Sequence, residues 1–415
     1  MTRRAPVYRW TFDAQSAARV PIRVGELTQE ETRWEFLYDP DYLALGHAAW
    51  ELDPTLIRHK QRGAFTRVGP VPFPVFCDIA LSGWSLDAVQ KRSATVLGTA
   101  TARDDEPWGW WERLLYAPAD GFGALFVGAP GDKPNAFDAL HDALKSVTKA
   151  SLTQASRDSS SGAMGGERPK IALYLEDDTG ALSRPVLLKF AMPSERADTV
   201  VAEATALTLA SELGMRVPAH EVLWFNDVPA LSIARFDRGQ GLRGPVHHCV
   251  SAATALDLSP VSDVDDPRRS YVRLRSKLKR PADPLELYSR IVLNAVVGNT
   301  DDHPWNTSLR QLGRGDWELA PLYDVLPFVE RAGVPAFRMD ITMKKPSRAA
   351  TKANLLAAGK QIAGLQEADG WQIVERTRAH VRAQWRRVFL HHCAPQPDAQ
   401  PEDWARVFEH DGLGP

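Results

Sequence analysis

The sequence predicts an α+β fold whose last part is mostly helical, and three patterns carry this prediction. Stretches that alternate polar and apolar residues recur before residue 130, as they do in half-buried strands. Strand-like and helix-like stretches then follow one another between residues 170 and 236. Beyond residue 283, apolar residues recur every three or four positions, which is the spacing of packed helices. These shifts in pattern divide the chain into residues 1–130, 131–240 and 241–415.

The composition is that of a globular protein and argues against several functional classes. With 415 residues and 44% hydrophobic residues, the chain can bury a large core without disulfides or structural metals. The net charge of -2 provides no overall field that would favour nucleic acid or a membrane surface. The three cysteines show no CxxC spacing, and no apolar stretch follows the N-terminal arginines. We therefore expect a cytoplasmic protein without a membrane segment.

The first region predicts a small mixed unit. Residues 22–24 and 34–38 alternate in the manner of strands, and residues 121–127 (GFGALFV) predict a strand that bends at its glycines. Three tryptophans fall within residues 108–111, and we expect them to pack in the core rather than to form an exposed partner surface. Residues 135–149 place apolar side chains on one face of a predicted helix.

A serine- and glycine-rich stretch follows. Residues 156–166 (SRDSSSGAMGG) carry no hydrophobic period, which predicts a flexible loop rather than a packed element. Two interpretations stay open. Composition alone favours a domain linker, whereas a loop that covers phosphate is the sharper alternative, because backbone without side chains can approach an anion closely.

The elements after this loop alternate in type. The predicted order is strand 170–175, strand 185–190, helix 196–213, strand 221–225 and strand 229–236. Gly214 is the stop signal of the helix. Two strands, a helix and two strands are the layout of the small lobe of a protein kinase, and also of many other α+β folds.

The last region predicts helices. Asp283 is expected to be the N-cap of the first one, with Pro284 at its first position. Its apolar pattern, with Leu287 and Ile291, runs toward Gly298. Residues 354–393 predict further helices.

The densest run of polar residues, 298–306 (GNTDDHPWN), follows a helical pattern. Asn306 comes five residues after Asp301, which is the spacing of a kinase catalytic loop. In such a loop the aspartate accepts the proton of the acceptor hydroxyl, and the asparagine oxygen binds magnesium. Asparagine and aspartate are also common in turns, so this run alone is equally well explained as a polar loop.

A further carboxylate follows in residues 317–327 (WELAPLYDVLP). We interpret Asp324 as the end of a strand that presents a metal-binding carboxylate to a triphosphate. Residues 323–325 then stand where other kinases have Asp-Phe-Gly. The alternative, a turn residue before Pro327, is less favoured because both runs flank one short hairpin.

Two upstream charges complete the set. Lys189 closes an apolar strand, which is unusual for a lysine unless its ammonium meets an anion such as phosphate. Glu203 lies among apolar residues of the next predicted helix and could pair with Lys189. The alternative is that both are exposed charges at an edge.

Taken in order, these motifs resemble the HipA-like serine/threonine kinases, the toxins of bacterial toxin–antitoxin modules. The matching stretches are residues 24–28, 38–40, 121–125, 165–170, 189–190, 203, 212–218, 235–238, 299–306 and 320–324, so the resemblance covers nearly the whole chain. It implies a two-lobed protein-kinase-like fold. Residues 1–130 would be an N-terminal accessory subdomain, 131–240 the ATP-binding lobe with a glycine-rich loop at 156–170, and 241–415 a mostly helical catalytic lobe.

The resemblance implies the cofactors ATP and Mg²⁺ and a role for each matched residue. Asp301 would be the catalytic base, and Asn306 and Asp324 the magnesium ligands. Lys189 would hold phosphates with Glu203 as its partner. Further nucleotide contacts are implied for Gly165, Gly166, Lys170, Arg235, Phe236 and His303, with a buried charge network as the alternative for Arg235.

Two departures stand out. The family's loop often carries a serine whose autophosphorylation switches some members off, but this chain has Ala163 there, with Ser159 to Ser161 nearby as alternative acceptors. Pro304 and Trp305 replace the usual basic residue of the catalytic loop. That replacement puts the rate and the substrate preference in question.

The resemblance also implies partners. These are a protein substrate, which is an aminoacyl-tRNA synthetase for some members, and a cognate DNA-binding antitoxin through which DNA is contacted only indirectly. No membrane partner is expected. A catalytically weak module that docks an antitoxin, and a kinase for a small molecule, are the alternatives.

Other candidate sites are weaker. His-His-Cys triplets at 247–249 and 391–393 offer zinc ligands, but adjacent ligands seldom converge on one ion. The basic pair 268–269 with the run 273–280, and a second run at 344–352, are expected to be solvated faces rather than nucleic-acid contacts, because no aromatic residues lie within 273–280 or 344–352.

Overall fold

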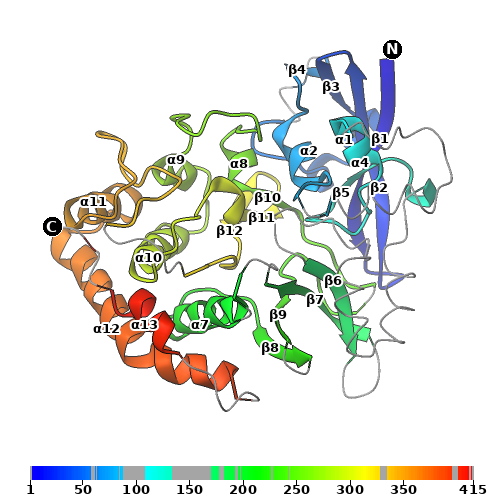
Figure 1. The fold of residues 1–415 in the computed structure, drawn as a ribbon. Helices are drawn as coiled ribbons and strands as arrows, with labels where there is room; N and C mark the ends of the chain where they lie inside the picture. Colours follow the sequence, from blue (N-terminus) through cyan, green and yellow to red (C-terminus); the bar gives the residue numbers. More distant parts are fainter. Residues whose placement is uncertain are drawn as a thin grey trace.

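The computed structural model describes residues 2–57, 61, 63–83, 85–86, 108–132, 170–176, 182–191, 195–196, 198–225, 228–241, 243–327, 334–394, 401–410 and 413. It is a mixed α+β structure, with two main antiparallel sheets and a group of helices beside them (Figure 1). The helix predicted over 135–149 and the loop with Ala163, Gly165 and Gly166 lie outside the described residues. No helix in the described part is long and apolar enough to cross a bilayer.

The first sheet is built from the N-terminal residues. Its order is β4-β3-β2-β1-β5, with β1 Thr2–Asp13, β2 Ala18–Glu30, β3 Arg33–Tyr38, β4 Phe65–Val68 and β5 Leu125–Val127. The strands predicted at 22–24 and 34–38 are thus confirmed. Short helical turns, α1 Pro40–Ala44 and η1 Gly46–Ala48, follow β3, and α2 Pro74–Ile79, α4 Trp110–Leu115 and η3 Pro130–Asp132 come later.

Aromatic side chains fill the core beneath this sheet. Trp34 and Phe36 are fully buried, and Trp111 of α4 stacks on Trp34 with 6.1 Å between ring centroids. The packing expected for the tryptophan cluster is therefore confirmed at Trp111.

The strand predicted over 121–127 is shorter than expected. It begins only at Leu125, because Gly123 adopts φ +68°, a left-handed conformation that ends the extended backbone. A Cβ at Gly123 would lie 2.8 Å from the carbonyl oxygen of Cys249. The glycine therefore allows two backbones from distant parts of the sequence to meet.

The second sheet carries a single long helix. Its order is β6-β7-β9-β8, with β6 Lys170–Glu176, β7 Leu182–Phe190, β8 His220–Phe225 and β9 Val228–Ala234. Helix α7, Thr199–Glu212, connects β7 to β8, and Gly214 follows it at φ +88° as the predicted stop. All five predicted elements of this region are confirmed, with shifts of a few residues at their ends.

Helix α7 is buried on nearly all sides. It packs on β8 and β9 on one side and on α12, Glu367–His392, on the other (Figure 1). A helix covered in this way needs apolar residues all round rather than on one stripe. The sequence of α7 has this character, apart from Glu203 and a few threonines.

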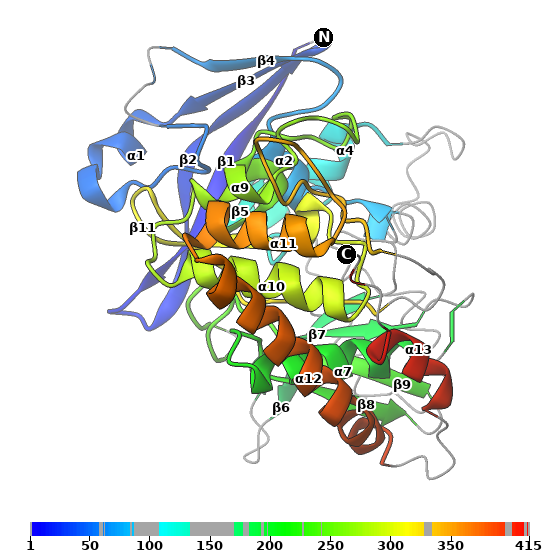
Figure 2. The same ribbon diagram turned by 90° about the vertical axis from the view of Figure 1, so that its left-hand side faces the viewer.

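The remaining elements form the helical part and a three-stranded sheet. They are β10 Cys249–Ser251, α8 Ala252–Ala255, α9 Tyr271–Arg275, α10 Asp283–Val296, η4 Pro304–Asn306, β11 Ser308–Gly313, β12 Asp316–Leu319, α11 Lys352–Ala358, η5 Gly359–Ala363 and α13 Glu402–Phe408. The order of the small sheet is β10-β11-β12. Figure 2 shows α12 crossing both α7 and α10, and it packs on each of them.

One expected helix cap is wrong. Asp283 is the first helical residue of α10 rather than its N-cap, and the cap position, Ala282, provides no side-chain bond. The Asp283 carboxylate instead accepts from the backbone N–H of Leu319 at 2.7 Å and from the guanidinium of Arg216. A tertiary partner has therefore replaced the local capping interaction.

Candidate active site

The polar loop begins where helix α10 ends. Gly298 adopts φ +68° and lets the chain turn back. The backbone N–H of Asn299 donates to the Asn294 carbonyl at 2.9 Å, and its side-chain amide donates to Asn294 Oδ1 at 3.1 Å. Asn299 Oδ1 in turn accepts from the Asp301 N–H at 3.3 Å. The position of Asp301 is therefore tied to the last turn of a buried helix.

Asp301 and Asn306 are joined across this loop. Asn306 Nδ2 donates to the backbone carbonyl of Asp301 at 2.7 Å, so its Oδ1 is the atom available to a cation. The Asp301 side chain is 61% exposed and can meet an acceptor from solvent. His303 Nε2 and Arg338 Nε lie 3.9 and 3.8 Å from its carboxylate oxygens.

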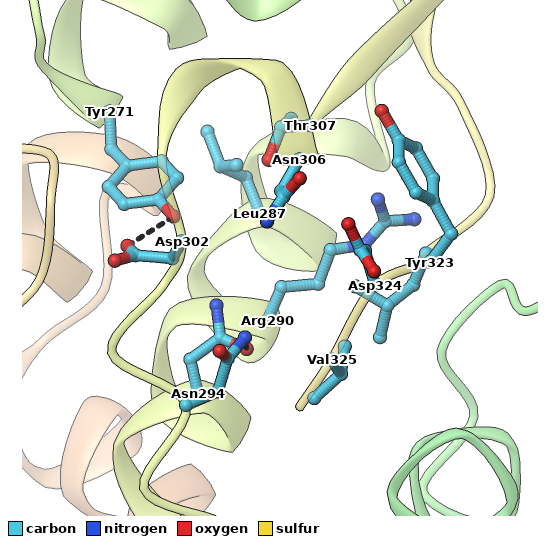
Figure 3. Close-up of a pocket in the computed structure, with 12 residues that line it drawn as sticks. Tyr271, Leu287, Arg290, Asn294, Asp302, Asn306, Thr307, Tyr323, Asp324 and Val325 are labelled. Carbon is cyan, nitrogen blue, oxygen red and sulfur yellow. Dashed lines mark hydrogen bonds between the residues drawn. The ribbon is translucent and has the colours of Figure 1, made fainter. Parts of the chain in front are cut away.

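Asp324 and Asn306 both face the small pocket drawn in Figure 3. The expectation that a strand ends at Asp324 is wrong, because β12 ends at Leu319 and the chain is irregular from there. Asp324 adopts φ +58°, a left-handed conformation that is costly for a residue with a side chain. Such strain persists where surrounding contacts hold it, and here Lys189 Nζ donates to Asp324 Oδ1 at 2.7 Å.

Lys189 also meets the predicted helical partner. Its ammonium donates to Glu203 Oε1 at 2.8 Å, and both side chains are buried. Burial alone would lower the pKa of Lys189, but Asp324 and Glu203 raise it above its ordinary value. The lysine is thus fixed as a permanent cation, held by one carboxylate from α7 and one from the chain after β12.

Lys170 lies opposite Lys189 across the β6–β7 pair. Two like charges facing each other on neighbouring strands repel unless an anion lies near. That anion is Asp324. Burial would raise its pKa, but Lys189, and to a smaller extent Lys170 and His303, hold the pKa below its usual range. The predicted Lys170 therefore belongs to the same cationic group as Lys189.

Asp302 belongs to the same loop, and no role was expected for it from the sequence. Asp302 is buried and accepts from the Tyr271 hydroxyl at 2.7 Å and from the Arg338 N–H at 2.8 Å (Figure 3). Burial raises the pKa of Asp302 to about 7, although both hydrogen bonds oppose this rise. The doubled aspartate was the one sequence signal. Tyr271 and Arg338 lie too far along the chain to be found by spacing.

Phe236 and Arg235 occupy different surroundings. The Phe236 ring stacks on Tyr323 with 5.5 Å between centroids, next to Asp324. The Arg235 guanidinium is buried and donates to Asp237 and to the backbone carbonyls of Asp120 and Gly121. This is the buried charge network that the sequence left open as an alternative. A nucleotide contact of Arg235 stays a prediction.

The donors at the pocket fit magnesium. An asparagine oxygen and a carboxylate are hard oxygen ligands, and magnesium usually takes few protein ligands beside water and substrate phosphates. Within the described ranges, no three His, Cys, Asp or Glu side chains come together as an all-protein metal cage. In the two His-His-Cys triplets, His248 contacts the Leu52 carbonyl, whereas His392 contacts Thr208.

Comparison with families and with curated proteins adds independent findings. A model of the HipA-like C-terminal domain matches residues 162–385. A protein of Sinorhizobium fredii (strain NGR234), "Putative kinase Y4mE", is 28% identical over 227 residues. The alignment covers 50% of this chain and 49% of that protein, so the chain spans about half the length of this curated relative.

A solved structure is also similar in fold. It is a chain from the Shewanella oneidensis MR-1 complex of the toxin–antitoxin proteins HipA and HipB with operator DNA. The superposition covers 98% of this chain and 94% of that chain, with a TM-score of 0.63 and 16% sequence identity. At 16% identity this comparison shows the fold alone.

Proposed function

Because the chain belongs to the HipA-like kinase family, we propose that it is an ATP- and magnesium-dependent protein serine/threonine kinase. The observation that carries this proposal is the position of Lys189. Its buried ammonium lies between Glu203 and Asp324, at 2.8 and 2.7 Å. A lysine placed between a helical glutamate and a metal-binding aspartate is the arrangement that positions ATP phosphates in protein kinases.

Under this proposal, each residue of the site has a separate role in phosphate transfer. Lys189 orients the α- and β-phosphates, and Lys170 adds positive charge on the neighbouring strand. Asp324 and Asn306 would hold magnesium, which would neutralise phosphate charge when bound. Asp301 orients the acceptor hydroxyl and takes its proton as the γ-phosphoryl group passes to that oxygen and ADP departs.

The same proposal assigns the regions. The sheet β6-β7-β9-β8 with α7 would be the ATP-binding lobe, and residues 241–415 the catalytic lobe. Residues 1–130 would be an accessory subdomain attached to both. The loop at 156–170, with Gly165 and Gly166, would cover the phosphates, because backbone N–H groups suit an anion. Phe236 and His303 would complete the nucleotide site.

For partners, we infer a toxin that arrests growth and is opposed by a cognate DNA-binding antitoxin. The support is the similarity in fold to a chain from a complex with HipB and operator DNA. The net charge of -2 favours indirect DNA contact through that antitoxin. The substrate would be a protein serine or threonine, with an aminoacyl-tRNA synthetase as one candidate.

The test is phosphate transfer from γ-labelled ATP, with magnesium and cell lysate, by the parent protein and by Asp301→Asn. A labelled protein band with the parent alone supports the kinase. Nucleotide binding without transfer supports a binding module instead, and label confined to a metabolite supports a small-molecule kinase. Asp301→Asn should retain ATP binding, since Asp301 faces the acceptor rather than the phosphates.

A further inference from the structure

The catalytic loop lacks a positive side chain where the reaction requires one. The transferring phosphoryl group carries negative charge on its three outer oxygens, so a cation on the acceptor side lowers the barrier. Pro304 is buried in η4, and Trp305 packs against the core and against His303. Neither of these two side chains can provide a charge.

Arg338 brings a guanidinium to this side of the site. Its Nε lies 3.8 Å from Asp301 Oδ1, and its side chain is 55% exposed. In the part of the chain that the structure describes, Asp301 is the one ion-pair partner of this guanidinium. At 3.8 Å the pair is loose and half-solvated, so the guanidinium can turn to a phosphate oxygen at little cost.

The backbone of Arg338 is held far more firmly than its side chain. Its N–H donates to the buried Asp302 carboxylate at 2.8 Å, directly next to Asp301 in the sequence. Phe337 and Met339 on either side are buried, whereas the side chain of Arg338 between them is largely exposed. The Asp340 carbonyl accepts from the Tyr271 N–H at 3.0 Å and fixes the next turn of the chain.

Among the residues that the structure describes, two other cations near the loop are either engaged by other groups or charged only conditionally. Arg269 lies over the Trp305 ring at 5.6 Å and donates to the carbonyls of Asp263 and Ser262 at 2.9 and 3.2 Å. His303 is charged only when it is protonated. Within the described ranges, Arg338 is therefore the permanent cation that lies next to Asp301 and faces solvent.

We propose that Arg338 contacts the transferring phosphoryl group and supplies the positive charge missing from the catalytic loop. The proposal rests on the proposed kinase function and names a further residue of that site. An arginine suits the role because its planar group can donate two parallel hydrogen bonds to phosphate oxygens.

The test compares Arg338→Gln with Arg338→Lys and with Arg33→Gln. Arg33 is a matched control, since its side chain is also 55% exposed and pairs with one carboxylate, Glu35, in β3. Arg338→Gln should lower kcat about 10-fold or more with little change in KM for ATP, because the contact forms as phosphate moves. Arg338→Lys should recover part of the loss, and Arg33→Gln should match the parent.

A binding measurement separates this role from a structural one. Mg²⁺, ADP and aluminium fluoride together mimic the transferring phosphoryl group, and Arg338→Gln should bind this mixture about 10-fold more weakly while binding ADP normally. Should the glutamine variant fail to fold, Arg338→Met keeps the apolar stem and provides the same comparison.

The outcomes are distinct. If the parent transfers phosphate and the neutral variants keep its kcat and its affinity for the aluminium fluoride mixture, Arg338 has no such role, and the kinase assignment survives. If the parent itself binds ATP without transferring phosphate, the proposed function fails, and the role of Arg338 fails with it.

Discussion

The buried ammonium of Lys189 gives one residue a role in stability and, under the proposed function, in ATP binding. Replacing Lys189 alone by methionine removes the ammonium that the buried Glu203 carboxylate binds, which costs about 3–5 kcal/mol of unfolding free energy. The double variant Lys189→Met/Glu203→Leu should regain most of this stability, since it removes both charges together. Neither variant should bind ATP tightly.

Urea unfolding and nucleotide titration on the same preparations check this expectation. A methionine variant as stable as the parent would show that the ion pair is not held in a buried environment. Recovery of ATP binding in the double variant would show that Lys189 has no role at the phosphates.

Asp302 predicts a pH dependence of stability. Its pKa of about 7 in the folded state lies above the ordinary value of roughly 3.9, so folding favours the protonated form. This contribution is complete below about pH 4 and is lost as the pH rises through about 7. The difference between the parent and Asp302→Asn, which cannot ionise, should therefore change by on the order of 1–4 kcal/mol across this window.

Unfolding free energies of both proteins at several pH values measure this difference. Asp78, whose pKa burial raises to about 6, titrates in the same window but is common to both proteins and cancels. A difference that stays constant from pH 4 to 8 would contradict the raised pKa of Asp302.

At the scale of elements, helix α8 depends on a residue from the N-terminal region. The half-buried Asp78 carboxylate accepts from the Ser251 N–H and hydroxyl, both at 2.7 Å, and from the Thr254 hydroxyl at 2.7 Å. Asp78→Ala leaves these donors without an acceptor and should cost about 1–3 kcal/mol.

A matched control is Asp13→Ala, which removes an exposed carboxylate from a local turn with Gln15 and Ser16. Its effect on the unfolding free energy should stay within about 0.5 kcal/mol. Equal losses of unfolding free energy in Asp78→Ala and Asp13→Ala would show that the bonds to α8 stabilise the fold no more than an exposed turn does.

The elements that the sequence predicted well are those whose pattern is local. The strands and helix between 170 and 234 follow from apolar periodicity and from the stop at Gly214. The cap at Asp283 and the strand end at Asp324 were wrong for one shared reason. In both, a distant cation, Arg216 or Lys189, binds the carboxylate and overrides the local rule.

At the scale of the whole molecule, a buried charge network joins the first sheet region to the second. Asp237 lies between Arg235 and Arg238, and both arginines reach the Gly121 carbonyl at 2.7 and 2.6 Å. Asp237 also accepts from the Gly123 N–H at 2.9 Å, and the two arginines hold its pKa at about 2 against the effect of burial.

Asp237→Ala therefore leaves two buried arginines with reduced compensation. We expect a loss of about 3–5 kcal/mol in unfolding free energy, and earlier proteolysis in the N-terminal region. Asp316→Ala, at an exposed strand end, is the control and should change little. Denaturant unfolding and timed proteolysis with mass spectrometry decide between a joined and an independent N-terminal region.

Contacts between segments that lie far apart in the sequence were the least predictable part of the structure. The family resemblance indicated the order of the site residues, and the structure brings Lys189, Glu203 and Asp324 together. The contacts of Asp237 with Gly123 and of Asp302 with Arg338 join residues that no periodic pattern relates. The partners of Asp237 and Asp302 depend on how distant segments pack, and the spacing of residues along a single sequence does not reveal this packing.

Helix α12 packs on both α7 and α10. Helix α7 carries Glu203, and α10 anchors the loop of Asp301. Helix α12 therefore links the two helices that position these residues. Glu212 of α7 reinforces this link through His380 and Arg387 of α12. Any movement of α7 relative to α10 must therefore displace or bend α12, and under the proposed function a molecule bound to the outer face of α12 would restrain phosphate transfer without occupying the ATP site.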